Sequence, residues 1–209
     1  MNKKTNSLYK IYVSILGVLL ISVFIQVVIY DRCKIKYIFA ILGVFLMLLG
    51  MLYVVKSRNW MNVFFIVMLV IRILIILKIA TPPVSDFEIL FNSAENLLQG
   101  NNVMNSLNYF FYFPYQTAVV LYFTFLLKIY NSVVTIKIAN CFFSVGTLII
   151  VYFIAKEFVN EKIAKMATIC YALFPFSLFY NTILSNQIPG AFFFYLGIYF
   201  IVLNRKKIT

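Results

Sequence analysis

Apolar runs long enough to cross a lipid bilayer recur along this chain. A bilayer core about 30 Å thick takes roughly 20 residues of α-helix to span. The runs LYKIYVSILGVLLISVFIQVVIY and YIFAILGVFLMLLGMLYVV already meet that length. Hydrophobic residues make up 64% of the chain and charged residues only 11%, whereas a soluble domain is nearer half apolar and a quarter charged. Because a single run of this length satisfies its backbone hydrogen bonds in lipid only as a helix, the sequence predicts an all-α integral membrane helix bundle.

We expect about six or seven transmembrane helices in a single domain covering residues 1–209. No internal repeat and no low-complexity linker divides the chain. The predicted spans are 9–30, 37–55, 60–80, 115–130, 138–155, 166–181 and 188–204.

The net charge of +12 does not indicate a nucleic-acid partner. The basic residues stand in twos and threes at the ends of apolar runs, as the positive-inside rule expects of cytoplasmic flanks. The chain contains no histidine, so metal sites built on imidazole are excluded, and we expect neither a metal nor a cofactor. The three cysteines share no motif spacing, and no disulfide is predicted.

The distribution of lysine and arginine predicts how the chain is oriented in a cell membrane. Lysines near the start place the N-terminus in the cytoplasm, and three more within 156–165 mark a cytoplasmic loop. Residues 79–127 lack lysine and arginine but hold half of the acidic residues, so we expect 81–114 to be external. Two features do not fit this orientation. It places Arg32, Lys34 and Lys36 on the external side, against the positive-inside rule. It also requires an odd number of crossings between the external residue 114 and the cytoplasmic residue 156, whereas two spans are predicted there. The segment 115–130 therefore either crosses the membrane or only dips into it.

The segment TPPVSDFEILFNSAENLLQGNN, residues 81–102, predicts an amphipathic helix in the first large external loop. Two prolines end the preceding span, Ser85 is a suitable N-cap, and Gly100 is a suitable helix stop. Apolar residues between them recur at helical spacing, with acids and amides on the other side. We expect this helix to lie in the membrane interface with its apolar face toward the lipid.

Asp86 and Glu88 fall in the first turn of that helix, at the expected water–lipid boundary. A carboxylate there can accept a proton from a substrate hydroxyl as a general base. A structural interpretation competes with this one. Ser85 and Glu88 have the spacing of a capping box, and Asp86 can simply complement the helix dipole.

Three further groups of residues have a functional and a structural interpretation. In NYFFYFPYQ, residues 108–116, the aromatic run forms an interfacial belt or lines a substrate site, and we assign Tyr115 and Gln116 to substrate binding. Arg72 lies in the middle of a predicted span, where a cation either faces a lipid phosphate or pairs with a polar group of the bundle. In SNQIPG, Asn186 and Gln187 either cap the last span or face the same site as Asp86.

Four segments, in this order, resemble GT-C-fold membrane glycosyltransferases, especially bacterial members of glycosyltransferase family 39, which includes protein O-mannosyltransferases and the lipid A aminoarabinose transferase. They are PPVSDFEILFNSAENLLQGN, YQTAVVLYFTFLLKIYNSVVTIKIAN, VYFIAKEFVNEKIAKMA and ALFPFSLFYNTILSNQ. The resemblance covers about residues 60–204 and leaves residues 1–59 as two additional N-terminal spans.

The resemblance implies an inverting enzyme that transfers a sugar from a polyprenyl-phosphate donor to an acceptor outside the cytoplasm. Asp86 takes the role of the base, and Glu88 matches a second acidic position of the family. The family's members are longer, so this chain corresponds to an N-terminal half whose missing half, or a partner subunit, completes the donor site. The expected partners are membrane lipid and lipid-linked sugar.

Two hypotheses without catalysis stand beside the enzyme. In the first, the chain is a truncated or split membrane subunit that is folded and catalytically silent. In the second, it is a small transporter of lipid-linked sugars, which predicts polar and charged residues deep in several spans. Only Arg72 has that position among the predicted spans, which counts against the transporter.

Overall fold

The computed structural model describes residues 60–79, 81–103 and 108–208, which belong to the compact unit Val55–Thr209. The predicted spans at 9–30 and 37–55 lie outside these residues. The described part of the chain is helical and contains no strand. Three of its helices are long and apolar enough to cross a membrane, and a bent helix pair would be a fourth crossing if it acts as one span. The prediction of a membrane helix bundle is confirmed at this level, and the count of six or seven spans stays a prediction.

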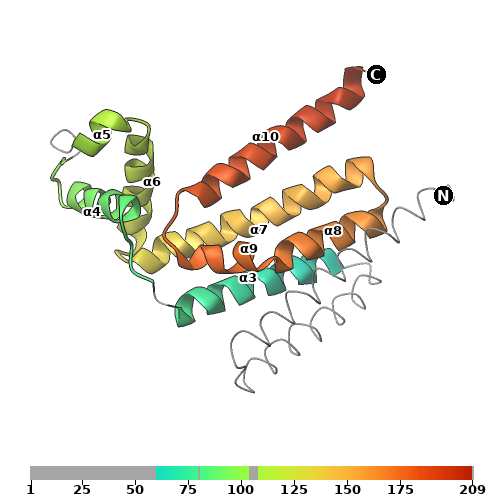
Figure 1. Ribbon diagram of the computed structural model, residues 1–209, viewed down its shortest axis with the longest axis horizontal. Coiled ribbons are helices and arrows are strands. Elements are labelled where there is room, and N and C mark those ends of the chain that lie inside the picture. Colours follow the sequence, from blue (N-terminus) through green and yellow to red (C-terminus); the bar gives the residue numbers. More distant parts are fainter. Residues whose placement is uncertain (1–59, 80, 104–107, 209) are drawn as a thin grey trace, which may run out of the picture. The chain divides into compact units, whose positions relative to one another are not determined.

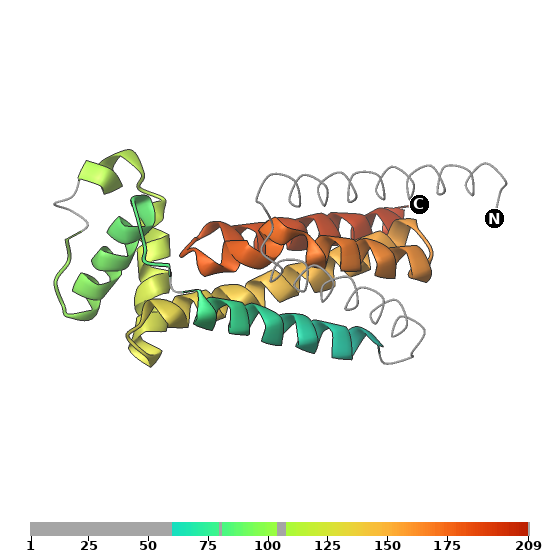
Figure 2. The same ribbon diagram turned by 60° about the horizontal axis from the view of Figure 1, so that its bottom comes forward.

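Helix α7 (Val133–Phe158) is the centre of the bundle, because it contacts α3 (Trp60–Lys78), α8 (Glu161–Leu173) and α10 (Gln187–Ile208). These long helices run alongside one another in Figures 1 and 2. Helices α3, α7 and α10 are the three candidate spans, and they agree with the predictions at 60–80, 138–155 and 188–204. Their length and apolar composition were sufficient to find them.

The predicted span at 166–181 is a broken helix. Helix α8 ends at Leu173, and α9 (Pro175–Phe179) and the 3-10 turn η1 (Tyr180–Thr182) continue the path after a bend of 60°. Proline has no backbone N–H and disfavours a helical conformation in the residue before it. Phe174 accordingly has the non-helical angles φ −59° and ψ 121°.

Three shorter helices form a cap at the end of the bundle where α3 ends and α7 and α10 begin (Figures 1 and 2). These are α4 (Asp86–Leu98), α5 (Asn108–Tyr112) and α6 (Gln116–Ile129), and α4 packs on α6. The apolar face of α4 is buried in a cluster that also includes residues of α5, α6, α7 and the segment before α10. The buried members are Leu90, Phe91, Ala94, Phe110, Val120, Phe123, Leu126, Leu127, Ile136 and Leu184.

The cap changes two expectations from the sequence. The amphipathic helix at 86–98 exists, but its apolar face packs against α6 and not against lipid. The predicted span at 115–130 is the 14-residue α6, about 21 Å long at 1.5 Å per residue and therefore short of the bilayer core. Between 114 and 156, α7 is the one described helix that is long enough to be a candidate span, and the number of crossings in this stretch stays a prediction.

Candidate functional site

Asp86 is exposed at the first position of α4, directly after a strained backbone position. Ser85 has φ 53° and ψ −131°, and it is the one described residue other than glycine with a positive φ. Its side chain makes no capping hydrogen bond, and the N–H groups of Glu88 and Ile89 donate to its backbone carbonyl at 3.0 and 3.2 Å. The helix starts where the sequence predicts, but the capping box is wrong. Glu88 is exposed on the same turn and takes no part in capping.

Tyr109 connects Asp86 with the start of α6. Burial raises the pKa of Tyr109, and the nearby charges of Asp86 and Tyr115 raise it further, while a hydrogen bond with Gln116 acts in the opposite direction. The same Gln116 accepts a hydrogen bond from Asn186 Nδ2 at 2.9 Å. Asp86, Tyr115 and Gln116 therefore lie near enough to Tyr109 to influence its pKa, and Asn186 joins this group through Gln116. Asn186 is engaged with α6 and not with capping α10.

A cavity of about 350 Å³ opens between α4 and α5 beside this group. Its wall includes the amides of Asn92, Asn96 and Asn108, together with Ser93 and Tyr109. The Ser93 hydroxyl is buried without a hydrogen-bond partner. Within the described residues, the side-chain amides of Asn92 and Asn108 also make no hydrogen bond. A wall of amides and hydroxyls, which both donate and accept, suits a ligand rich in hydroxyl groups.

The aromatic run beside the cavity stays open to both interpretations. Phe111 and Tyr112 are the most exposed of these rings, at 82% and 72%, and Tyr115 is also exposed. The rings of Phe113 and Tyr115 meet edge to face with centroids 6.2 Å apart. Exposed aromatic side chains at one end of a bundle fit an interfacial belt and a substrate wall equally well.

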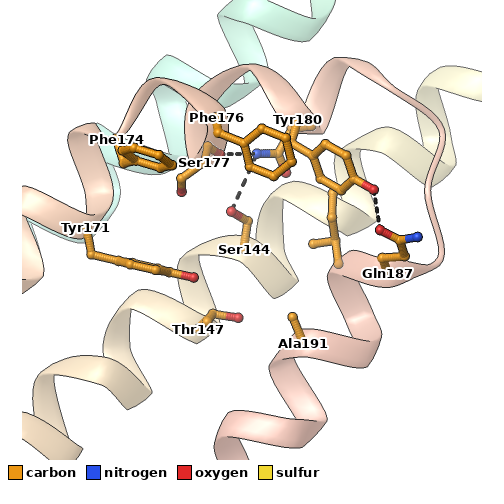
Figure 3. A pocket seen from close by; sticks show the side chains of 11 residues that line it. Ser144, Thr147, Tyr171, Phe174, Phe176, Ser177, Tyr180, Gln187 and Ala191 are labelled. Atoms are coloured by element: carbon orange, nitrogen blue, oxygen red, sulfur yellow. Dashed lines mark hydrogen bonds between the residues drawn. The ribbon is translucent and has the colours of Figure 1, made fainter.

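Arg72 and Gln187 are not part of the Asp86 group. Arg72 is fully buried in the bundle, where Nε donates to Ser144 Oγ at 3.1 Å and Nη2 donates to Ser177 Oγ at 3.2 Å. Both serines line a second cavity of about 320 Å³ around the break between α8 and α9. Gln187 lies on its far side and accepts a hydrogen bond from the Tyr180 hydroxyl at 2.5 Å (Figure 3).

A polar stripe on α7 was not predicted from the sequence. Lys137, Asn140, Ser144 and Thr147 follow one another at intervals of three and four residues, which places them on one face of a helix. Three of them are buried, and Lys137 is only 3% exposed. Lys137 Nζ donates to Thr81 O at 2.6 Å and to Thr81 Oγ1 at 2.9 Å, and Asn140 Nδ2 donates to Ser185 O at 2.8 Å. The spacing of polar residues within an apolar run was the available signal.

No family model, curated protein or solved structure matches this chain. Within the described residues, no group of three or more histidine, cysteine, aspartate or glutamate side chains gathers in a way that could hold a metal ion.

Proposed function

We propose that this chain is a membrane glycosyltransferase that moves a sugar from a polyprenyl-phosphate donor to an acceptor on the external face, with inversion and with Asp86 as the base. The observation that carries the proposal is the position of Asp86. Its carboxylate is exposed at the start of α4 and near enough to Tyr109 to influence the pKa of that hydroxyl, and Tyr109 in turn lines a cavity with amide and hydroxyl groups in its wall. An exposed carboxylate next to a site suited to hydroxyl groups is the arrangement that general-base catalysis requires.

The residues around Asp86 have separate roles in this proposal. The acceptor lies in the cavity between α4 and α5, where Asn92, Asn96 and Asn108 hold its hydroxyl groups and the ring of Tyr109 forms part of the wall. Asp86 accepts the proton of the attacking hydroxyl while the sugar leaves the lipid phosphate. Gln116, held by Asn186, keeps Tyr109 in place. Glu88 and Tyr115 bind substrate from the exposed rim.

The membrane arrangement belongs to the same proposal. The N-terminus is cytoplasmic, the cap of α4, α5 and α6 is external, and α4 lies at the level of the lipid headgroups with α6 beneath its apolar face. The lysines within 156–165, at the other end of α7 from the cap, support this orientation. The chain would then place its acidic surface where a lipid-linked donor presents its sugar.

The test is transfer of radiolabelled sugar from a membrane-extracted lipid donor, with expression matched by blot. Asp86→Asn should reduce turnover by about 10²–10⁴-fold, or roughly 3–5 kcal/mol of barrier, because an amide cannot accept the proton. Glu95→Gln removes an acid from the same helix outside the proposed site and serves as the matched control. Equal activity of the parent and Asp86→Asn would refute the base. A parent no more active than membranes without the chain would favour the silent subunit.

A transporter of lipid-linked sugars is the second candidate, and two observations favour it. The bundle buries three cations, Arg72, Lys137 and Lys165, so Arg72 is not its only buried charge. A cavity with hydroxyl and amide groups in its wall also surrounds the break between α8 and α9, and broken helices line the substrate sites of many transporters. Uptake of labelled lipid-linked sugar into vesicles containing the chain, without transfer to an acceptor, would select this candidate.

A further inference from the structure

Arg72 is a buried cation without a counter-charge. Its side chain is 0% exposed, and its guanidinium donates to Ser144 Oγ, Ser177 Oγ and Met68 O, all of them neutral. No carboxylate in the described part of the chain pairs with it. Arginine remains protonated in proteins, so the bundle holds a full positive charge where burial makes an unpaired ion costly. Such a site favours an anion that arrives as a ligand.

The two serines carry the effect of this charge into the cavity at the helix break. Each hydroxyl accepts an N–H from Arg72, and Ser144 Oγ also accepts from Asn181 Nδ2 at 3.4 Å. Neither hydroxyl donates to another group of the described chain, so each keeps a proton for a ligand. Because an acceptor bound to a cation becomes a stronger donor, Ser144 and Ser177 offer two polarised O–H groups. Figure 3 shows Ser144, Thr147 and Tyr171 around the same space, with Gln187 and Ala191 beyond.

Asn181 requires a hydrogen-bond donor from the ligand, whereas the two serines require an acceptor. It is 1% exposed, lines the cavity, and has its Oδ1 atom buried without a hydrogen-bond partner. The ligand that satisfies the whole wall therefore accepts two hydrogen bonds, donates one, and carries a single negative charge. A phosphate monoester has a second pKa of about 6, and its monoanion, which predominates below that pH, has this combination. A carboxylate or a phosphodiester has the charge but no O–H for Asn181.

The surroundings of the cavity indicate where such a phosphate comes from. The cavity lies between the candidate spans α7 and α10 and the bent pair. Its edge includes Phe174 and Phe176, which are 58% and 63% exposed. Exposed phenylalanines among membrane-spanning helices fit a hydrocarbon chain, so a phosphate held here would belong to a lipid.

We propose that the cavity at the break between α8 and α9 binds the phosphate monoester headgroup of a single-chain membrane lipid, with Arg72 as the buried counter-charge acting through Ser144 and Ser177. The site is separate from Asp86, which does not line it. The identity of the lipid rests on the proposed function, because a polyprenyl monophosphate is the carrier that remains once the sugar has been transferred.

The experiment measures binding of geranyl phosphate to the full chain in nanodiscs of zwitterionic lipid, by native mass spectrometry. Geraniol, methyl geranyl phosphate and inorganic phosphate are the comparison ligands. Geranyl phosphate should bind at least tenfold more tightly than each of them. The double change Ser144→Ala with Ser177→Ala should weaken binding tenfold or more, because each hydroxyl loses a hydrogen bond to a charged group. Arg72→Met should abolish the preference for geranyl phosphate over geraniol.

Lys137→Met is the matched control. Lys137 is the other buried cation of the described chain that lacks a carboxylate, but it donates to Thr81 and does not line this cavity. It should bind geranyl phosphate as the parent does. Equal binding of geranyl phosphate and geraniol, or an equal loss in Lys137→Met and the serine variant, would overturn the site. Inorganic phosphate that binds as tightly as geranyl phosphate would overturn the lipid as its source, and methyl geranyl phosphate that binds equally well would overturn the monoester.

The binding measurement is independent of glycosyl transfer because it needs no sugar and does not involve Asp86. A chain that prefers geranyl phosphate but transfers no sugar would refute the proposed function and leave this site standing. A chain that transfers sugar in an Asp86-dependent manner but shows no preference for the phosphate would refute this site alone.

Discussion

The cap and the bundle differ in where their charged side chains lie. In the cap, Asp86 and Glu88 are exposed on the surface of α4, and the buried cluster beneath them is apolar. In the bundle, the outer surface is apolar, and Arg72 and Lys137 are buried among hydroxyl and carbonyl groups. A region surrounded by water keeps its charges outside, whereas a region surrounded by lipid places them inside. This contrast supports the bundle, which carries the three candidate spans, as the part suited to a membrane.

The largest expected effect concerns the side of the membrane on which α6 ends. If α6 belongs to the cap and does not cross, single cysteines at Asn92 and Asn131 should react with an impermeant reagent in intact cells. A cysteine at Asn160, at the other end of α7, should react only after lysis. The background lacks Cys33, Cys141 and Cys170. Labelling at Asn92 but not at Asn131 would restore the span at 115–130, and labelling at Asn92 only after lysis would reverse the orientation.

The next prediction concerns the core of the cap. Phe123 is fully buried between α6 and its neighbours, while Phe125 on the same helix is 64% exposed. Phe123→Ala should cost the cap about 3–5 kcal/mol, and Phe125→Ala should cost little. Limited proteolysis with proteinase K between Leu98 and Val103 reports the opening of the cap. Equal cleavage of both variants would show that the cap is not held by this cluster.

Two glycines in the bundle allow the same comparison between a packed position and an open one. A Cβ at Gly146 of α7 would lie 2.7 Å from the ring of Phe192 on α10, whereas a Cβ at Gly197 would meet nothing within 4 Å. Phe192 is confined by Phe143, with centroids 5.2 Å apart, so Gly146→Ala should lower stability by about 1–3 kcal/mol. Gly197→Ala should be neutral or stabilising by up to about 1 kcal/mol.

The melting temperature of the chain in detergent measures both glycine changes. Adding Phe192→Leu to Gly146→Ala should restore part of the loss, because it removes the ring atoms that the new methyl group meets. If Gly146→Ala and Gly197→Ala have the same effect, the contact between α7 and α10 is looser than described.

The long helices of the bundle could be predicted from the sequence because the bilayer fixes their length. Helix α6 could not be separated from a span by composition, since its 14 residues are as apolar as those of a crossing helix, and only its short length and its packing on α4 distinguish it. The break at Pro175 had a local signal, because proline interrupts a helix wherever it stands. No local signal indicated what the apolar face of α4 contacts, since lipid and α6 present the same hydrocarbon surface.

The candidate site also combines features that local sequence predicts with features that depend on tertiary packing. The helix start at Asp86 follows from local sequence, and its approach to Tyr109 and Gln116 depends on α5 and α6 folding back over α4. Arg72 could be singled out as a costly cation, but its partners Ser144 and Ser177 are 72 and 105 residues away. The burial of Lys137 had no signal in the sequence, because it lies near the end of an apolar run, where a lysine ordinarily reaches the surface.

The smallest expected effect is at Ser85, where the two interpretations of the first turn of α4 differ in sign. A capping box would make Ser85→Ala costly by about 1 kcal/mol. In the structure the hydroxyl makes no capping hydrogen bond, so Ser85→Ala should change stability by less than about 0.5 kcal/mol. The positive φ of 53° is unfavourable for any residue with a Cβ, so Ser85→Gly should stabilise the segment by about 1 kcal/mol. Ser85→Val should be the least stable of the three, because a β-branched side chain tolerates this region worst. Proteolysis of the segment before α4 ranks the variants. The order glycine, alanine, valine from most to least stable supports strain next to Asp86, whereas an alanine variant clearly weaker than the parent, with no gain from glycine, would restore the capping box.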